Sequence, residues 1–172
     1  MPESHESAQK ELTRLEIWSS IATLLERLPT ALDAQLQRDS GITHFEYGVL
    51  YALDTAPQRT LRLSTLAGYA SCTLSRLSRA ISRLEGRGWV KRTIDPSDGR
   101  FTLAALTDDG HAKVAQATPG HEALVDRLVF QALTPTQARQ LGIASRRISA
   151  AIAPEPSWVP NAEIQNRSLS AR

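Results

Sequence analysis

Apolar residues recur every three or four positions along the first quarter of the chain. An average interval of 3.6 residues is typical of one face of an α-helix, and it predicts a helix over residues 7–38. Pro29 lies inside this helix and lacks a backbone N–H, so we expect a kink there. Gly41 is expected to end the helix. The apolar stripe consists of Leu12, Leu15, Trp18, Ile21, Leu25, Leu28, Leu32 and Leu36.

Capping residues divide the middle of the chain into short elements. Thr43 followed by Glu46 has the spacing of a capping box and predicts a helix that stops before Pro57. The inward side chains of that helix would be Phe45, Val49, Leu50 and Leu53. The elements expected next are an extended segment at 59–61, a helix over 64–70 and a turn at 71–72.

Thr73 is placed to cap a helix that extends to about Arg87 and has two different faces. The inward face would hold Leu74, Leu77, Ile81 and Leu84. The other face carries a row of arginines at helical spacing, Arg76, Arg79, Arg83 and Arg87. An amphipathic helix of this kind packs on one side and can meet a polyanion with the other. The alternative is a solvated face whose arginines pair with Glu85 or Asp98.

A β-hairpin and two further helices complete the chain. Asp-Pro and Asp-Gly pairs in the segment 95–100 favour turns, and they separate two strand-forming runs, 89–94 and 101–106. Thr107 is placed to cap the next helix, which Pro119-Gly120 would interrupt or bend. Thr134-Pro135 opens a last helix, and residues 154–172 are expected to form a tail. The apolar stripes of these helices are Leu124, Leu128 and Ala132, and then Ala138, Leu141, Ile148 and Ile152.

The composition is that of a globular protein that needs no disulfide or structural metal to fold. The chain has 172 residues, of which 41% are hydrophobic and 22% charged. No apolar run approaches the ~18 residues of a membrane span, and the polar N-terminus resembles no secretory signal, so we expect a cytoplasmic protein. One cysteine, Cys72, excludes an intrachain disulfide and is interpreted as a free thiol rather than a redox switch. His111 and His121 are interpreted as surface residues, and no metal or cofactor is expected.

The net charge of +2 conceals an asymmetry. Between residues 59 and 100, nine basic residues face three acids, which gives a net charge of +6. The remainder holds 11 basic and 15 acidic residues and is therefore −4. Arginine forms planar, bidentate contacts with phosphates and guanine edges. Helix, turn, helix and hairpin is also the order of a winged helix-turn-helix, whose second helix enters the DNA major groove.

Three motifs in this segment resemble one family. The run from Ile81 to Val90, Ile-Ser-Arg-Leu-Glu-Gly-Arg-Gly-Trp-Val, is similar to its pattern "hydrophobic-x-R-L-E-x-[RK]-G-hydrophobic-V". The run from Asp95 to Gly110 is similar to its wing, "D-P-x-D-x-R" followed by "L-T-x-x-G", and Leu63 to Ala67 to its "L-x-x-L-A". In order and spacing, the chain resembles the MarR family of bacterial transcriptional regulators from about residue 12 to 152.

The resemblance implies a mostly α fold with a small β-wing, in which a winged helix-turn-helix at 41–107 is flanked by dimerisation helices at 7–40 and 108–153. It implies a homodimer that binds a pseudo-palindromic operator in double-stranded DNA, most often as a repressor. Arg100 matches the wing arginine that enters the minor groove, and Asp98 the acid that orients it, so that a surface pair between them is compatible with DNA contact. The second helix of the helix-turn-helix is the recognition helix, and its expected DNA contacts are Thr73, Ser75, Arg76, Arg79 and Arg83.

Many members of the family respond to small aromatic or phenolic compounds in a cleft between the reading head and the dimer helices. The candidate ligand residues are Trp18, His44, Tyr47 and Tyr51, for which burial in the core is the alternative. Arg62 departs from the family, which often has Ser or Thr there to cap a helix, so that this helix start is expected to shift. No catalytic set is recognisable, so we expect no enzyme. A ligand-insensitive regulator, or a dimeric protein-interaction module without DNA binding, stays open as an alternative function.

Overall fold

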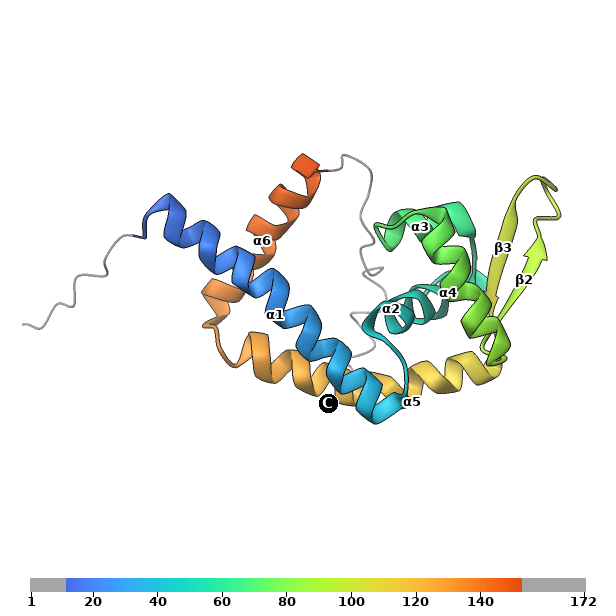
Figure 1. Ribbon diagram of the computed structural model, residues 1–172, viewed down its shortest axis with the longest axis horizontal. Coiled ribbons are helices and arrows are strands. Elements are labelled where there is room, and N and C mark those ends of the chain that lie inside the picture. The colour runs from blue at the N-terminus through green and yellow to red at the C-terminus, as the bar shows by residue number, and fades with distance from the viewer. Residues whose placement is uncertain (1–11, 153–172) are drawn as a thin grey trace, which may run out of the picture. The chain divides into compact units, whose positions relative to one another are not determined.

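The computed structural model describes residues 12–152 (Figure 1). The chain divides after Ala31 into an N-terminal unit and a larger unit that starts at Leu32. In chain order the elements are α1 (Arg14–Ser40), α2 (His44–Asp54), the 3-10 turn η1 (Pro57–Arg59), β1 (Thr60–Arg62), α3 (Leu63–Tyr69), α4 (Leu74–Gly86), β2 (Val90–Ile94), β3 (Thr102–Leu106), α5 (Asp108–Val125), the π-helical segment η2 (Asp126–Phe130) and α6 (Pro135–Ile152). The elements from α2 to β3 are called the head below.

The start of α1 differs from the predicted helix over 7–38. Thr13 and Glu16 form a capping box, in which the Thr13 N–H donates to Glu16 Oε2 (2.8 Å) and the Glu16 N–H donates to Thr13 Oγ1 (3.2 Å). The helix therefore begins at Arg14 and not before it; positions 7–11 lie outside the described residues. It continues through Pro29 as one element and ends at Ser40.

Three hydroxyl caps predicted from the sequence are confirmed. Thr43 and Glu46 form a complete capping box at α2. The Thr73 side chain accepts a hydrogen bond from the Arg76 N–H at the start of α4, and the Thr107 side chain accepts one from the Gly110 N–H at the start of α5. Each cap satisfies a backbone donor that the first helical turn leaves unpaired. These caps decide where the helices of the head begin.

A three-stranded antiparallel sheet runs in the order β1-β3-β2, which makes β3 the central strand. Leu103 of β3 lies opposite Arg62 of β1 and Thr93 of β2. The loop between β2 and β3 extends beyond the body of the head (Figure 1). The strands β2 and β3 with this loop, residues 90–106, are called the wing. Its strands begin one residue later than predicted, and β1 is shifted by one residue from 59–61 to Thr60–Arg62.

One hydrophobic core joins the end of α1, the helices of the head, the sheet and α5. Its most buried members include Leu36, Leu50, Leu53, Leu66, Leu77, Ile81, Leu84 and Val90. Leu74 was predicted to face inward, and this was wrong, because its side chain is 53% exposed. Residues 74–76 are all exposed, so the first turn of α4 extends beyond the core. Ala80 occupies the inward face instead.

An interruption or bend was predicted at Pro119-Gly120, but the helix α5 is not interrupted there. It runs to Val125, and the departure from α-helical geometry comes later, in η2, where the Gln131 N–H donates to the Asp126 carbonyl (2.9 Å). Leu124 is buried as expected, but Leu128 is exposed. Gly120 has a packing reason, because a Cβ there would lie 3.0 Å from Gln35 Nε2 of α1.

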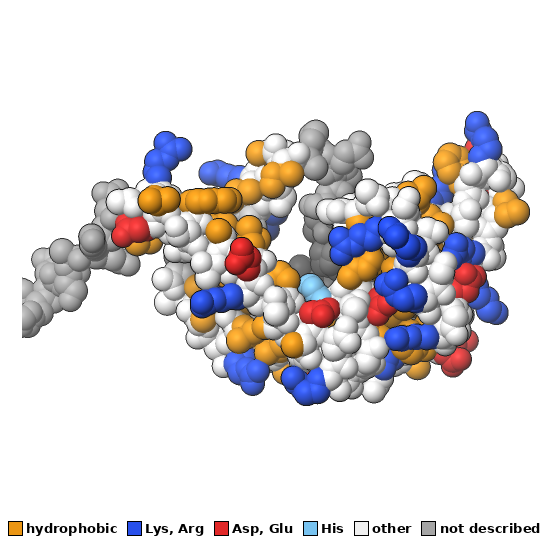
Figure 2. Space-filling view, in the orientation of Figure 1, with side chains coloured by type: hydrophobic (Ala, Val, Ile, Leu, Met, Phe, Trp, Pro, Cys, Tyr) orange, Lys and Arg blue, Asp and Glu red, His pale blue; other side chains and the backbone are white. Residues whose placement is uncertain are grey.

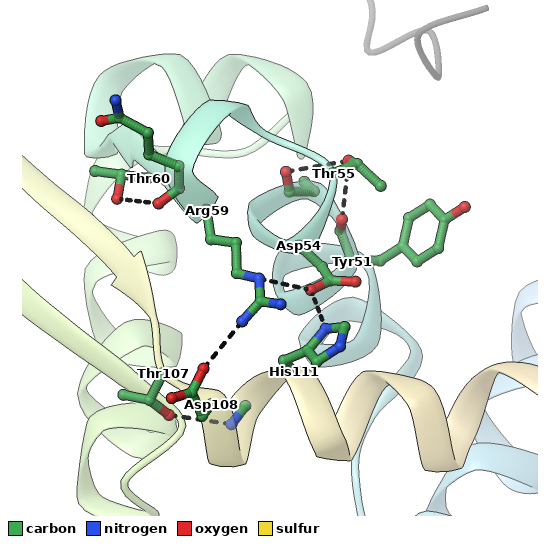
Figure 3. A network of polar contacts seen from close by, with 11 residues as sticks. Tyr51, Asp54, Thr55, Arg59, Thr60, Thr107, Asp108 and His111 are labelled. Carbon is green, nitrogen blue, oxygen red and sulfur yellow. Dashed lines mark hydrogen bonds and ion pairs between the residues drawn. The ribbon is translucent and has the colours of Figure 1, made fainter. Parts of the chain in front are cut away.

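A polar network ties the head to the start of α5 (Figure 3). Nδ1 of His111 on α5 lies 2.6 Å from Oδ1 of Asp54, the last residue of α2. Arg59 lies between two acids, with Nε 3.7 Å from Asp54 Oδ1 and Nη1 3.2 Å from Asp108 Oδ1. Arg59 also has a left-handed backbone conformation (φ 52°), which costs free energy in a residue with a side chain. The two ion pairs hold it where β1 begins.

Within residues 12–152, no helix is long and apolar enough to cross a membrane. No group of three or more His, Cys, Asp or Glu side chains in the same range is arranged to hold a metal ion. The predicted tail over 154–172 lies outside the described residues.

Candidate nucleic-acid interface

The first turn of α4 presents three of the predicted contact residues to solvent. Thr73, Ser75 and Arg76 are all exposed. Thr73 Oγ1 is already engaged by the Arg76 N–H (3.2 Å), so its hydroxyl hydrogen remains available as a donor. The Arg76 guanidinium lies over the Phe45 ring of α2, 4.7 Å from the ring centroid. This cation–π contact restricts an arginine that would otherwise be free to rotate.

The four arginines of the α4 row have different surroundings. Arg79 is exposed and makes no hydrogen bond or ion pair with the described part of the chain. Arg83 Nε lies 2.9 Å from Glu46 Oε1. Arg87 donates to the Gly41 carbonyl (3.0 Å) and lies over the Trp89 ring. The row therefore pairs with neither Glu85 nor Asp98.

Glu46 connects the start of α2 to α4. Burial raises the pKa of its carboxyl, but the hydrogen bonds from the Thr43 N–H and the Arg83 guanidinium outweigh burial, and the pKa lies below its ordinary value. The carboxyl is therefore ionised at neutral pH. Arg83 keeps a half-exposed side chain, so it can still contact a phosphate while Glu46 holds it.

The wing carries Arg100 on a loop closed by hydrogen bonds. The Asp95 N–H donates to the Phe101 carbonyl (2.9 Å), and the Phe101 N–H donates to the Asp98 carbonyl (3.0 Å). Asp98 holds Arg100 in two places, Nε on Oδ1 (3.0 Å) and Nη2 on Oδ2 (2.7 Å). These bonds from Arg100 lower the pKa of the Asp98 carboxyl. The Arg100 side chain is nevertheless 85% exposed, so the pair orients the guanidinium without covering it.

Basic side chains gather on the side of the larger unit that carries α4 and the wing (Figure 2). The sequence located this charge between residues 59 and 100, and the fold brings its exposed members onto neighbouring elements. Each predicted contact residue of α4 and the wing is exposed or half-buried. Three of them have a partner of opposite charge: Arg83 pairs with Glu46, and Asp98 and Arg100 pair with each other.

A cavity of about 1130 Å³ lies between α2, α3, α4 and the second half of α5. Three of the four predicted ligand residues line it, namely His44, Tyr47 and Tyr51. Trp18 is on the N-terminal unit and is not among the lining residues. Further lining residues are Phe45, Tyr69, Arg76, His121, Glu122, Asp126 and Phe130. Arg76 therefore belongs both to the wall of the cavity and to the exposed first turn of α4.

Aromatic rings lie next to one another, tilted, along one wall of this cavity. The Tyr47 ring lies 4.6 Å from the His121 ring and 5.8 Å from the Tyr51 ring, and the His44 and His121 rings are 5.6 Å apart. Burial lowers the pKa of both histidines, and it raises the pKa of Tyr47 to about 12. At neutral pH the rings are therefore uncharged, and Arg76, Glu122 and Asp126 supply the charge of the lining.

The sequence interpretation of His121 as a surface residue was wrong. Its ring lies against Tyr47 in the cavity wall, and its Nδ1 atom is buried without a hydrogen-bond partner among the described residues. His44 and Tyr47 lie more than 70 positions earlier in the chain. No local pattern around Pro119 could have revealed this contact, which depends on how α2 and α5 pack.

The comparisons with known proteins agree with this geometry. Residues 42–102 match the model of the MarR family. The crystal structure of Sco3205, a MarR family transcriptional regulator from Streptomyces coelicolor in complex with DNA, is 41% identical to this chain. The match covers 86% of this chain and 99% of that one, with a TM-score of 0.79. The chain belongs to the MarR family.

Other MarR-type proteins match to different extents. AbsC, a MarR family transcriptional regulator from Streptomyces coelicolor, is 29% identical over 85% of this chain and 99% of its own, with a TM-score of 0.78. The HTH-type transcriptional regulator YdcH of Bacillus subtilis is 29% identical over 93 residues, which are 53% of this chain and 63% of that protein. MarR membership confirms the predicted winged helix-turn-helix fold. It also agrees with the expectation that the chain is no enzyme, because the family consists of regulators.

Proposed function

We propose that this MarR-family protein is a transcriptional regulator that binds a pseudo-palindromic operator as a homodimer. The observation that carries the proposal is the exposure of the first turn of α4 together with that of an oriented Arg100 on the wing. A recognition helix reads base edges in the major groove with its N-terminal residues. In this chain those residues are Thr73, Ser75 and Arg76. The 41% identical relative whose structure contains DNA supports the same role for this head.

The other predicted contacts divide into two groups. Arg79 and Arg83 lie further along α4, where contacts to the phosphate backbone position a protein without reading sequence. Arg100 is the candidate for the minor groove, which is narrow in A/T-rich DNA and attracts arginine. Asp98 orients Arg100 through two charge-assisted hydrogen bonds.

The test is a titration of the purified protein with labelled DNA from its own promoter region, followed by fluorescence anisotropy. Tight binding that resists random competitor DNA, and whose logarithm falls steeply with the logarithm of salt concentration, is expected. Binding that ignores salt and sequence would contradict the proposal and would favour a protein-interaction module.

Arg76 and Arg79 make a matched pair for the next measurement, because both are exposed α4 arginines but only Arg76 is in the first turn. Arg76→Ala is expected to weaken the operator complex by about 1–3 kcal/mol and to relax specificity at one position. Arg79→Ala is expected to weaken operator and random DNA alike. Equal behaviour of the two variants on both DNAs would refute the base-reading role of Arg76.

The dimer is supported by apolar side chains that are exposed in the described part of the chain. On α1, Leu15 is 71% and Trp18 61% exposed, and α6 has no buried residue at all. Unpartnered apolar helix faces of this kind close symmetric dimers. We expect light scattering to give twice the chain mass. Ile148→Glu on α6 should produce a monomer that binds only half an operator, whereas a monomeric wild-type protein would refute the proposal.

We further propose repression that a small aromatic effector relieves by occupying the cavity. The uncharged aromatic wall and the shared residue Arg76 support this, because a molecule in contact with Arg76 competes with DNA for the same guanidinium. The smallest probes are phenol and benzoate, each screened for release of operator DNA. Gly48 lines the cavity, and a Cβ there would meet no atom within 4 Å, so Gly48→Leu is chosen to place a larger side chain in the cavity. This variant should bind DNA normally and resist the effector; a panel of aromatics without effect on the wild type would favour the ligand-insensitive alternative.

A further inference from the structure

Arg62 lies where β1 meets α3, and its side chain contacts the wing. It is the last residue of β1 and also the N-cap residue of α3. The helix α3 begins at Leu63, one residue before the predicted start at 64. The Arg62 side chain makes no capping hydrogen bond to α3. It is directed instead to the loop of the wing.

Four contacts join Arg62 to both sides of that loop. Its Nε and Nη2 atoms lie 2.8 and 2.7 Å from Asp95 Oδ2, and Nη2 lies 3.5 Å from Ser97 Oγ. Its guanidinium carbon lies 4.4 Å from the centroid of the Phe101 ring. Asp95 follows β2 directly and Phe101 immediately precedes β3. One side chain therefore contacts both ends of the loop that carries Arg100.

The ion pair with Arg62 compensates the charge of a buried carboxylate, that of Asp95. Asp95 is buried, and its other carboxylate oxygen accepts from the Ser97 N–H (2.8 Å) and the Ser97 hydroxyl (2.6 Å). Among the described residues, Arg62 is the cation that neutralises it. Removing the arginine would leave the Asp95 charge, which is the buried member of the pair, without compensation. Asp95 would then reach for water, and the loop would lose its fixed position against β1.

We propose that Arg62 is a positioning residue that holds the loop of the wing in place. It thereby fixes the distance between the operator bases that α4 contacts and the flanking bases that Arg100 contacts. This inference rests on the proposed DNA-binding function. Arg62 acts through Arg100 and not by touching DNA. Its guanidinium is occupied on one edge by Asp95 and on one face by Phe101, and its side chain is 41% exposed, against 85% for Arg100.

The experiment uses two operators with the same central bases and either A/T-rich or G/C-rich flanks. The measured quantity is the ratio of their affinities for the full-length protein. We expect the wild type to prefer the A/T-rich flanks and Arg100→Ala to lose that preference. Arg62→Ala should lower the ratio to the value of Arg100→Ala, while its discrimination between the operator core and random DNA stays. The double variant should lose no more than either single variant, because residues that act through one another are not additive.

Lys91→Ala is the matched control, since Lys91 is an exposed wing cation with no contact to Asp95. It removes the same charge and should keep the flank preference. If Arg62→Ala fails to fold, Arg62→Lys is the second variant. It retains the charge beside Asp95 but loses the two-nitrogen contact with the carboxylate and the contact with the Phe101 ring. Its expected signature is a lower flank ratio together with faster hydrogen exchange of the Ser97 amide.

The outcomes separate this inference from the proposed function. An unchanged flank ratio in Arg62→Ala and Arg62→Lys, with the ratio lost in Arg100→Ala, would overturn the positioning role and leave DNA binding in place. Losses that add in the double variant would mean that Arg62 binds DNA itself, which also overturns it. A wild type that binds the operator but ignores the flanks would overturn the positioning role together with the minor-groove role of Arg100.

Discussion

Gly110→Ala tests how the wing is attached to the rest of the fold. A Cβ at position 110 would lie 2.2 Å from the carbonyl oxygen of Trp89 and 2.7 Å from Leu106 Cδ1. Real Cβ atoms keep at least 3.0 Å, so the carbonyl would have to retreat by about 0.8 Å. It cannot do so freely, because the Trp89 carbonyl accepts from the Thr107 N–H (3.0 Å), just before α5. The strain therefore falls on the junction between wing and α5.

The magnitude follows from two opposing terms. Forcing extra atoms into a packed site costs up to about 3 kcal/mol, and alanine in place of glycine in a helix returns up to about 1 kcal/mol. We expect a net loss of about 2 kcal/mol in the free energy of unfolding, or a melting temperature lower by roughly 4–8 °C. Gly48→Ala is the matched control, because α2 has open space at that position, and it should stabilise the protein by up to about 1 kcal/mol.

The assay is urea unfolding followed by circular dichroism, with all variants at one protein concentration because the stability of the proposed dimer would depend on concentration. A Gly110→Ala protein as stable as Gly48→Ala would refute the reasoning. It would mean that the close approach of α5 to Trp89 is not required for folding. A destabilised variant should also bind operator DNA more weakly, since the wing depends on this junction.

Three further outcomes are expected. Thr73→Ala should destabilise the protein by about 1 kcal/mol through loss of the α4 cap, measured by urea unfolding against Ser75→Ala, which removes no cap. Stability should fall as the pH drops from 3.8 towards about 2, because Ser97 and Arg62 lower the pKa of Asp95 to about 2 in the folded state; an Asp95→Asn protein that kept this part of the pH profile would contradict the assignment. Stability should also begin to fall below pH 6.5, because burial lowers the pKa values of His44 and His121 and the unfolded chain takes up the protons first; titrating a His121→Gln protein should show a shallower fall.

Local rules predicted the parts of this fold that depend on neighbouring residues. The caps at Thr43, Thr73 and Thr107 were predictable because a hydroxyl and the backbone donor it accepts from are three residues apart. The turn chemistry of residues 95–100 predicted the hairpin for the same reason. The predicted strand and helix ends in the head mostly differ by about one residue, which is the usual uncertainty of element boundaries.

Contacts between distant segments were not predictable. Arg83 was paired with Glu85 or Asp98 in the alternative interpretation, but its partner is Glu46, 37 positions away. Leu74 continued the apolar stripe of α4, and only the extent of the core shows that the first turn lies beyond it. Pro119-Gly120 was expected to interrupt or bend the helix, yet α5 continues through these residues and the irregular turn lies at 126–130. Each of these outcomes depends on packing, which a local pattern does not contain.

The divided carboxylate of Glu46 has a mechanical consequence. One oxygen accepts from the Thr43 N–H (3.1 Å) and the other from Arg83 Nε (2.9 Å). Because a carboxylate is planar and rigid, it cannot turn towards one partner without leaving the other. Glu46 therefore couples the beginning of α2 to the middle of α4. A displacement of α4 that keeps both hydrogen bonds must therefore carry the beginning of α2 with it.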